Sequence, residues 1–224
     1  MYKGNRITVV IPCLNEELGL QRLLESVPAF VDEVIVVDNG SSDRSAEIAF
    51  RLGAIVIPEF RRGYGRAYKS GFSKATGDII ATLDADCSYP IGALSKLLDA
   101  FLESPVGFLS ASRFPMRDCA SMKIAGRLGN RLLSVLMSVL FLRRVRDSQS
   151  GMWVFNRAVL EKMNLRSNGM AFSEEIKIEA MRNPAIGFDE ALVNYGNRIG
   201  QRKLEPWKDG VRNLTFLFRK RFAP

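Results

Sequence analysis

The chain has 224 residues, 47% of them hydrophobic and 25% charged, which suits one globular domain with a normal core. It contains no histidine, and this excludes Ser-His and Cys-His catalysis and metal sites built on imidazole. Its three cysteines, Cys13, Cys87 and Cys119, are odd in number and far apart, which fits neither a disulfide framework nor a zinc cluster. We therefore expect catalysis to use carboxylates, basic side chains, a metal ion or backbone dipoles.

The net charge of +8 is concentrated in two segments. Residues 113–146 hold eight basic residues and one acidic residue, and residues 198–224 hold eight basic and two acidic residues. These segments carry +7 and +6, so the rest of the chain carries −5. Such a distribution predicts a polyanionic partner, whether phosphate groups, an anionic membrane face or nucleic acid.

Strand-like and helical segments alternate along the first half of the chain. The apolar or β-branched runs lie at 7–11, 33–37, 54–57, 79–83 and 106–110, and helical patterns lie between them at 18–27, 43–52, 65–75 and 92–102. This alternation predicts an α/β fold with a central, mostly parallel sheet and helices on both faces. Ligands of such sheets bind at the carboxyl ends of the strands.

The pattern changes after residue 113. Residues 122–142 are predicted to form a helix, which is apolar from 132 to 142 except for two serines. That run is shorter than the ~20 apolar residues needed to span a bilayer, and no signal peptide opens the chain, so we expect a cytoplasmic protein. A strand at 151–155, a helix at 172–181 and a basic, aromatic-rich tail from 198 follow.

Two carboxylates, Asp84 and Asp86, stand where the 79–83 strand leaves the sheet. There the chain turns, so both can converge on one divalent cation, whose shell is usually completed by phosphate oxygens and water. Asp38 ends the 33–37 strand and would share the same crevice. Taken alone, Asp-x-Asp equally describes a strand end with solvated acids, but the surrounding motifs favour a metal site.

Three strand-end motifs lie in a distinctive order: Pro12-Cys13-Leu14-Asn15-Glu16-Glu17, Asp38-Asn39-Gly40-Ser41-Ser42-Asp43 and Asp84-Ala85-Asp86. Together they resemble a family 2 glycosyltransferase of the GT-A fold. The resemblance implies that the first motif and the acid of the second hold the nucleotide base and ribose. It also implies that Asp-x-Asp holds Mg²⁺ or Mn²⁺ on the donor diphosphate.

Later motifs resemble the polyprenyl-phosphate branch of this family, the dolichol-phosphate mannose and glucose synthases. These motifs lie at 61–67, 76–78, 84–90, 112–114, 147–152 and 198–204, so the match covers nearly the whole chain. Two positions depart from the pattern. Leu14 stands where relatives often carry Tyr beside the base, which leaves the base unassigned, and Arg202 replaces a usual Ser.

The resemblance implies a role for each group of site residues. The donor would be bound by Pro12, Asn15, Glu16, Asp38, Gly40, Arg62, Gly65, Asp84, Arg198 and Lys203. The metal ligands would be Asp84, Asp86 and Ser88, and the acceptor phosphate would lie on Arg113, Arg127, Arg131 and Ser134, beside the apolar helix.

The catalytic residues would be Asp84, Asp86 and Asp147. The resemblance implies that Asp147 lies near the acceptor, where it could act as a base. A phosphate monoester, however, has a second pKa near ~6 and is already nucleophilic at neutral pH, so Asp147 could instead orient Arg127 or Arg131. Glu175 matches an acid common in the family.

These assignments predict metal-dependent, inverting transfer of a sugar from a UDP- or GDP-linked donor to a polyprenyl phosphate, dolichyl or undecaprenyl. We expect one catalytic domain over residues 1–224, with a membrane-facing acceptor helix at about 121–142 and a basic tail at about 198–224. The protein would bind peripherally to the cytoplasmic face of an anionic membrane.

Three other functions compete with this interpretation. A sugar-1-phosphate nucleotidyltransferase would need a Gly-rich, Arg-containing loop after the first strand, and residues 12–17 are not one. An Asp-x-Asp phosphatase would place its acids after the first strand and follow them with Gly-Thr, whereas this chain has Asp86-Cys87-Ser88. A non-catalytic basic module that binds nucleic acid or membrane leaves Asp38, Asp84 and Asp86 unexplained, because they would repel such a partner, so we expect no nucleic acid.

Overall fold

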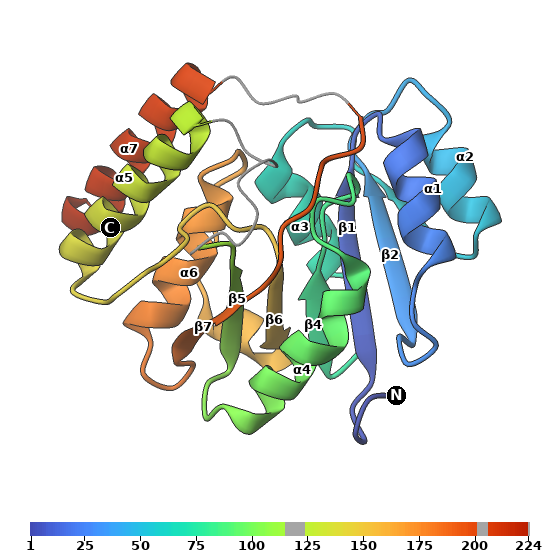
Figure 1. Ribbon diagram of the computed structural model, residues 1–224, viewed down its shortest axis with the longest axis horizontal. Helices are drawn as coiled ribbons and strands as arrows, with labels where there is room; N and C mark the ends of the chain where they lie inside the picture. The colour runs from blue at the N-terminus through green and yellow to red at the C-terminus, as the bar shows by residue number, and fades with distance from the viewer. Residues whose placement is uncertain (115–123, 201–205, 224) are drawn as a thin grey trace.

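The computed structural model describes residues 1–114, 124–200 and 206–223, in which a central sheet carries helices on both faces (Figure 1). The strands are β1 (Ile7–Cys13), β2 (Glu33–Asp38), β3 (Ile55–Pro58), β4 (Ile79–Thr82), β5 (Phe108–Ser112), β6 (Trp153–Asn156) and β7 (Phe188–Leu192). The α-helices are α1 (Glu17–Glu25), α2 (Ser45–Arg51), α3 (Tyr64–Phe72), α4 (Leu94–Glu103), α5 (Ile124–Phe141), α6 (Phe172–Arg182) and α7 (Pro206–Phe222). Two short 3₁₀ helices, η1 (Ile91–Ala93) and η3 (Arg157–Lys162), complete the secondary structure named here.

The sheet has the strand order β3-β2-β1-β4-β6-β5-β7 in the described part of the chain. Strands β1 to β4 pair in parallel, as the alternation of strands and helices predicts, and β7 pairs in parallel with β5. Only β6 runs antiparallel to its neighbours in these ladders, β4 and β5. The predicted α/β fold with a mostly parallel sheet is confirmed.

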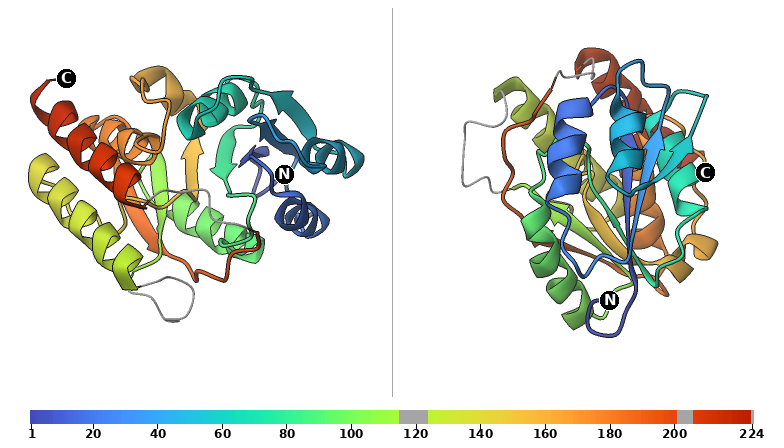
Figure 2. Two further views of the ribbon diagram at one scale, coloured as in Figure 1. Left: turned by 90° about the horizontal axis from the view of Figure 1, so that it is seen from above. Right: turned by 90° about the vertical axis from the view of Figure 1, so that its right-hand side faces the viewer.

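Helices cover both faces of the sheet (Figure 2), and a hydrophobic core lies beneath each layer of helices. Helices α1 and α4 bury their apolar faces against one side through Leu20, Leu23, Leu97 and Phe101, with α2 beside them. On the other side α3 and α6 pack against the sheet through an aromatic cluster that includes Tyr68, Trp153 and Phe172. Strands covered on both faces are continuous apolar runs, as β1 and β4 are.

Helices α5 and α7 lie side by side at one end of the molecule (Figure 1). They form a third core with α6, centred on Met137, Ile178, Met181 and Leu217. The sequence pattern predicts α5 but describes α7 only as a basic tail. The structure makes most of that tail a helix packed against α5 and α6.

Candidate active site

The carboxyl ends of β1, β2 and β4 meet at one edge of the sheet, where two of the loops are tied together. The Ser42 amide donates to Asn15 Oδ1 at 2.6 Å, and the Glu16 amide donates to Ser45 Oγ at 2.9 Å. Asn15 adopts a φ of 50°, which turns the chain between β1 and α1. The loop after β1 and the loop after β2 therefore form one wall of the site.

Asp84 is half-buried just past the end of β4, between two elements. The Tyr64 hydroxyl from α3 donates to Asp84 Oδ1 at 3.3 Å. A Cβ at Gly151 would lie 2.5 Å from Tyr64 Oη and 3.0 Å from Asp84 Oδ2, so this approach requires glycine at 151. Burial and the neighbouring carboxylate of Asp86 raise the pKa of Asp84 to about 7. The site thus holds two acids that repel one another.

Asp86 is held on both of its oxygens. The amide and hydroxyl of Ser88 donate to Oδ1 at 2.9 and 2.6 Å, and Arg198 Nη1 lies 2.9 Å from Oδ2. Arg198 Nη2 also pairs with Glu16 Oε1, so one guanidinium bridges two acids. Ser88, predicted as a metal ligand, is fully buried and orients Asp86 here.

The residues present fit a hard divalent cation. Carboxylate oxygens are the ligands that Mg²⁺ and Mn²⁺ prefer, and a cation between Asp84 and Asp86 would relieve the repulsion that raises the Asp84 pKa. Among the described residues no group of three or more acidic or cysteine side chains is arranged to hold a metal. A cation held by two carboxylates takes its remaining ligands from phosphate oxygens and water.

Asn39, which is not among the predicted site residues, organises the segment that leads into α3. Its Nδ2 donates to the carbonyl oxygens of Glu59 and Arg61 at 2.9 and 3.1 Å, and its Oδ1 accepts from the Gly63 amide at 2.7 Å. This ties the segment before α3, including Arg62, to the end of β2. A buried side chain that bonds only to backbone leaves no signal in a sequence.

Other predicted donor residues lie around the same edge. Asp38 Oδ1 accepts from the Ser41 amide at 3.1 Å, and Gly40, with a φ of +84°, lies beside Arg62. Pro12 is in the β1–β2 ladder, opposite Val37. A Cβ at Gly65 would lie 2.6 Å from the Ser167 oxygen, before α6, and 2.8 Å from Phe172 Cβ at the start of α6, so close packing accounts for this glycine. Lys203 lies outside the described residues.

Arg113 and Asp147 form a buried, two-pronged ion pair. Arg113 Nε and Nη2 lie 2.6 and 2.7 Å from Asp147 Oδ2 and Oδ1, and the Arg113 amide donates to Oδ2 at 3.1 Å. Burial alone would raise the pKa of Asp147, but the Arg113 guanidinium outweighs it and holds that pKa below its ordinary value. Asp147 therefore orients Arg113, so the expectation that it orients Arg127 or Arg131 is wrong. Because Arg113 contacts both carboxylate oxygens of Asp147, these contacts do not favour a role as a base.

Lys177 holds the loop that carries Asp147, a role that the sequence does not indicate. This lysine of α6 is fully buried, and its Nζ donates to the carbonyl oxygens of Asp147, Ser148 and Ser150 at 3.0, 2.8 and 2.9 Å. Burial lowers the Lys177 pKa to about 8. A lysine in a helix usually faces solvent, so only the tertiary structure identifies this one.

Ser134 connects the same loop to α5. Its hydroxyl accepts from the Ser148 amide at 2.9 Å and donates to the Asn130 carbonyl at 2.8 Å. Arg127 and Arg131 precede it by about two turns and one turn and share its side of the helix, Arg127 half-buried and Arg131 exposed. Glu175 instead accepts from the Ser167 amide at 2.7 Å and lies 3.3 Å from Lys220 Nζ, which ties α6 to α7.

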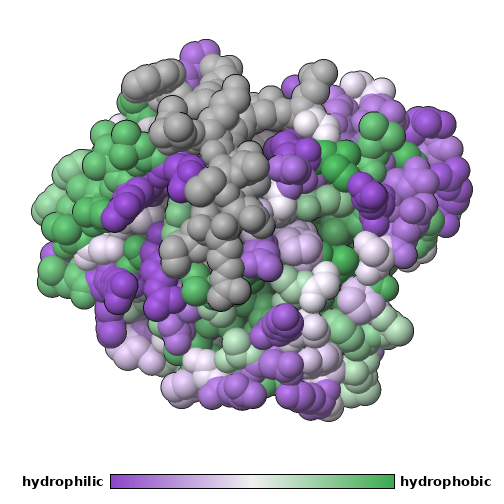
Figure 3. Space-filling view, in the orientation of Figure 1, coloured by the Kyte–Doolittle hydropathy of each residue, from purple (hydrophilic) through white to green (hydrophobic). Residues whose placement is uncertain are grey.

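The α5–α7 pair exposes an apolar stripe, seen as the green surface at the left of Figure 3. Its members are Leu128, Leu132, Val135, Val139 and Leu142 from α5 and the residue after it, and Val211, Leu214, Phe218 and Phe222 from α7. In the described part of the chain, no helix is both long and apolar enough to cross a membrane.

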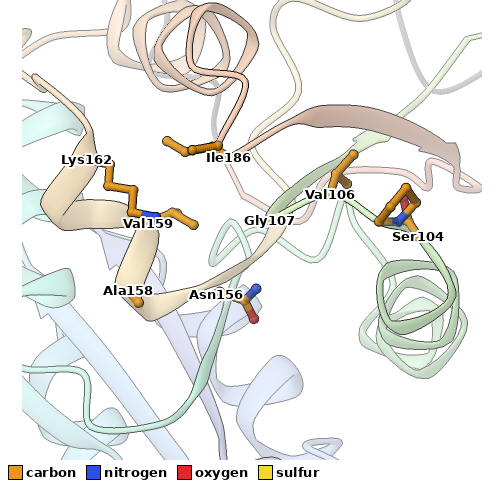
Figure 4. A pocket seen from close by; sticks show the side chains of 10 residues that line it. Ser104, Val106, Gly107, Asn156, Ala158, Val159, Lys162 and Ile186 are labelled. Carbon is orange, nitrogen blue, oxygen red and sulfur yellow. The ribbon is translucent and has the colours of Figure 1, made fainter.

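A separate cavity of about 390 Å³ lies at the opposite edge of the sheet (Figure 4). Its lining includes Gly107 at the start of β5 and Asn156 at the end of β6. Because Asn156 pairs with Ile79, the first residue of β4, this cavity is at the amino ends of the parallel strands. No carboxylate lines it, so it is not the active site.

Comparison with known proteins places the chain in a family. The family model named "Glycosyl transferase family 2" matches residues 8–163. The low-salt glycan biosynthesis hexosyltransferase Agl6 of Haloferax volcanii is 35% identical over 218 residues, which cover 94% of this chain and 52% of that protein. The chain therefore spans about half the length of Agl6. The dolichyl-phosphate hexose transferase of the same organism is 31% identical over 213 residues, covering 94% of this chain and 91% of that protein.

Solved structures share the fold. Glucosyl-3-phosphoglycerate synthase of Mycobacterium tuberculosis, crystallised with Mn²⁺, UDP and glucosyl-3-phosphoglycerate, superposes with a TM-score of 0.77. The two are 23% identical, and the match covers 97% of this chain and 80% of that one. This confirms the predicted GT-A fold. The family match and the curated relatives together show that the chain is a glycosyltransferase and belongs to glycosyl transferase family 2.

Proposed function

We propose that this glycosyltransferase moves a sugar from a nucleoside-diphosphate sugar to a polyprenyl phosphate, with Mg²⁺ or Mn²⁺ held by Asp84 and Asp86. The observation that carries the proposal is the proximity of two charged groups. The two mutually repelling acids, Asp84 and Asp86, lie within electrostatic reach of the buried Arg113–Asp147 pair, which is next to a helix that exposes an apolar stripe. Relatives named as dolichyl-phosphate and undecaprenyl-phosphate transferases support this acceptor.

On the donor side, the residues of the chain position the nucleotide. Asp38 and the loops after β1 and β2 would hold the base and ribose, and Tyr64 and Ser88 keep the two acids oriented. When bound, the cation would offset the negative charge that develops on the leaving diphosphate. Arg198 would exchange its acid partners for diphosphate oxygens.

On the acceptor side, Arg113, Arg127, Arg131 and Ser134 would hold the phosphate headgroup. The two substrates are both anions, so bringing them together requires fixed cations. A phosphate monoester oxygen is already a nucleophile near neutral pH and attacks C1 of the sugar in line with the departing diphosphate, which inverts C1. No protein base is needed, and Asp147 acts by holding Arg113 in place.

The lipid chain of the acceptor would lie along the membrane to which the α5–α7 pair attaches. An amphipathic helix buries its apolar face at the membrane interface without spanning it. Exposed basic residues border the stripe, including Arg131, Arg143, Arg212 and Arg219, and would favour an anionic, cytoplasmic leaflet. In this arrangement residues 1–224 work as one catalytic domain with its own membrane contact.

The test is product identification by mass spectrometry. The protein is incubated with Mn²⁺, a polyprenyl phosphate and a panel of UDP- and GDP-linked sugars, and a glycolipid is expected with at least one donor. EDTA should abolish product, and excess Mn²⁺ should restore it. Asp86→Asn should give none while keeping its fold by circular dichroism, because it removes a charge from a repelling pair. Transfer to 3-phosphoglycerate but not to polyprenyl phosphate would overturn the proposed acceptor.

A further inference from the structure

A second cavity, of about 260 Å³, lies beside Asp84. Its walls come from the start of α3, the segment before α6 and the first turns of α7: Gly63, Tyr64, Gly169, Met170, Ala171, Asp209, Arg212 and Asn213. Tyr64 forms part of the wall and its hydroxyl also donates to Asp84. One residue, Tyr64, therefore links the cavity wall to Asp84, to which the proposed function assigns the metal ion on the donor diphosphate.

Asn213 connects this cavity to the acceptor side. Its Nδ2 donates to Gln149 Oε1 at 2.8 Å, and the Gln149 amide donates to Asp147 Oδ1 at 3.2 Å. Gln149 Nε2 in turn donates to Glu174 Oε1 at 2.6 Å. The cavity wall is thus linked at Tyr64 to Asp84 and at Asn213 to the loop that holds Arg113. A sugar that passes from the diphosphate to the acceptor phosphate must lie between those two points.

The direction of these hydrogen bonds fixes what Asn213 offers to a ligand. Its amide nitrogen is used by Gln149, so its Oδ1 is left as an acceptor. Asn213 is only 4% exposed, and no donor among the described residues reaches that oxygen. A buried acceptor without a donor is unfavourable and rare in native proteins. A hydroxyl group from a bound molecule would satisfy it.

We propose that this cavity receives the sugar ring of the donor and that Asn213, on α7, selects among sugars by the position of a hydroxyl group. This inference rests on the proposed function. It assigns part of the sugar subsite to α7, which lies outside the central sheet. The volume is slightly below the ~300 Å³ at which pockets for drug-sized ligands begin, which suits a single ring. Asp209 and Arg212, whose Oδ1 and Nη1 lie 3.7 Å apart, line the same cavity.

The experiment measures donor binding without acceptor, so that it does not depend on transfer. Calorimetry with Mn²⁺ compares UDP-glucose, UDP-galactose, UDP-N-acetylglucosamine and GDP-mannose, each against its own nucleoside diphosphate. For the sugar nucleotide that the parent binds best, Asn213→Leu should weaken binding by about tenfold, the worth of one hydrogen bond. The diphosphate should keep its affinity within about twofold, because its contacts lie elsewhere.

Two further variants make the result specific. Asn213→Asp keeps an acceptor oxygen and should lose less affinity for the preferred sugar than Asn213→Leu. Thr215→Ala changes an exposed residue of the same helix, whose hydroxyl bonds only within the helix, and should behave as the parent. Circular dichroism and thermal midpoints establish whether each variant is folded. If Asn213→Leu is not folded, the comparison of Asn213→Asp with the parent replaces it.

Distinct outcomes separate this inference from the proposed function. Equal losses of sugar nucleotide and diphosphate, or unchanged discrimination between the glucose and galactose donors in both Asn213 variants, would overturn the sugar subsite. Parent protein that binds a sugar nucleotide through Asn213 but makes no glycolipid would overturn the proposed acceptor and leave the subsite standing. If the parent binds none of the donors, the sugar subsite and the proposed function are both contradicted.

Discussion

Arg113 has a structural role that complicates any test of acceptor binding by mutation. Arg113→Ala would leave the Asp147 carboxylate buried without the guanidinium that neutralises its charge, a change that typically costs about 3–5 kcal/mol. We therefore expect urea unfolding to show this variant strongly destabilised. Arg131→Ala, at an exposed position, should keep the stability of the parent and raise the KM for polyprenyl phosphate.

Two outcomes would contradict these predictions. If Arg113→Ala unfolds at the same urea concentration as the parent, the buried pair is not formed in solution. If Arg131→Ala loses nucleotide affinity in proportion to its loss of turnover, then Arg131 belongs to the donor side.

Glu174 gives the protein a stability that depends on pH. Burial raises its pKa to about 8, from an ordinary value of 4.5. Between these values the folded state holds a proton that the unfolded state has released, so the free energy of unfolding falls as pH rises, by up to ~1.4 kcal/mol per unit. Glu174→Gln still accepts from Gln149 and cannot titrate. It should match the parent near pH 5 and exceed its stability at pH 8.

Urea unfolding at pH 5, 6.5 and 8 measures this difference. The series stops at pH 8 because Lys177, whose pKa burial lowers to about 8, titrates above that value with the opposite sign. A stability difference between variant and parent that is the same at all three pH values would show that Glu174 does not titrate in this range.

At the level of elements, the site could be predicted where local sequence determines it. Each of β1, β2 and β4 is an apolar run that ends in a polar motif, and parallel strands place their carboxyl ends at one edge, so Asp38, Asp84 and Asn15 could be placed together. Strand limits differ by a few residues, as for the expected 106–110 strand, which lies at Phe108–Ser112.

The rest of the site depends on contacts between distant elements. Asn39, Lys177 and Asn213 are polar residues buried by partners 20 or more positions away, and nothing near them in sequence marks that burial. Strand β7 has an acidic pair within it, and α7 has many charges, so neither reads as part of a core. Both form because packing against β5 and α6 outweighs their local sequence preference.

Helix α1 reaches the turn that carries Asp86 only because residue 19 is glycine. A Cβ there would lie 2.5 Å from the Ala85 carbonyl oxygen and 3.1 Å from Asp86 Cα. Gly19→Ala should therefore push the turn and α1 apart, destabilise the protein by about 1–3 kcal/mol and reduce metal-dependent transfer. Urea unfolding and the glycolipid assay measure the two effects.

Gly129→Ala is the matched control on α5. No atom lies within 4 Å of the added Cβ, so alanine should stabilise that helix by up to ~1 kcal/mol. Parent-like stability and activity of Gly19→Ala would mean that the turn has room to move, and the close approach would then have no functional weight.

For the whole molecule, the apolar stripe on α5 and α7 predicts attachment to anionic vesicles. Leu136 and Leu140 pack into the third core, so the informative positions are Leu132 and Val139, which are 65% and 64% exposed. The double variant Leu132→Ser/Val139→Ser should bind anionic vesicles at least tenfold more weakly, because burying each side chain at the interface contributes on the order of 1 kcal/mol. Co-sedimentation measures the partition.

Salt and a distant variant separate the two contributions to this attachment. Binding of the parent should weaken as salt rises, because the Debye length falls to ~3 Å at 1 M. Phe50→Ser changes an equally exposed apolar residue on α2, at the other end of the sheet, and should leave binding unchanged (Figure 1). Equal loss in both variants would mean that the α5–α7 stripe is not the contact surface.

Arg198 acts as an internal counter-ion, because its guanidinium neutralises Glu16 and Asp86 together. A dication without a nucleotide must compete with that guanidinium for Asp86 and supplies no anion to replace the carboxylate that Arg198 would lose. A dication that arrives with a diphosphate brings a replacement anion, so the exchange leaves every charge paired. Ion and nucleotide should therefore enter together, each raising the affinity for the other, and the enzyme would stay metal-poor until its donor is present.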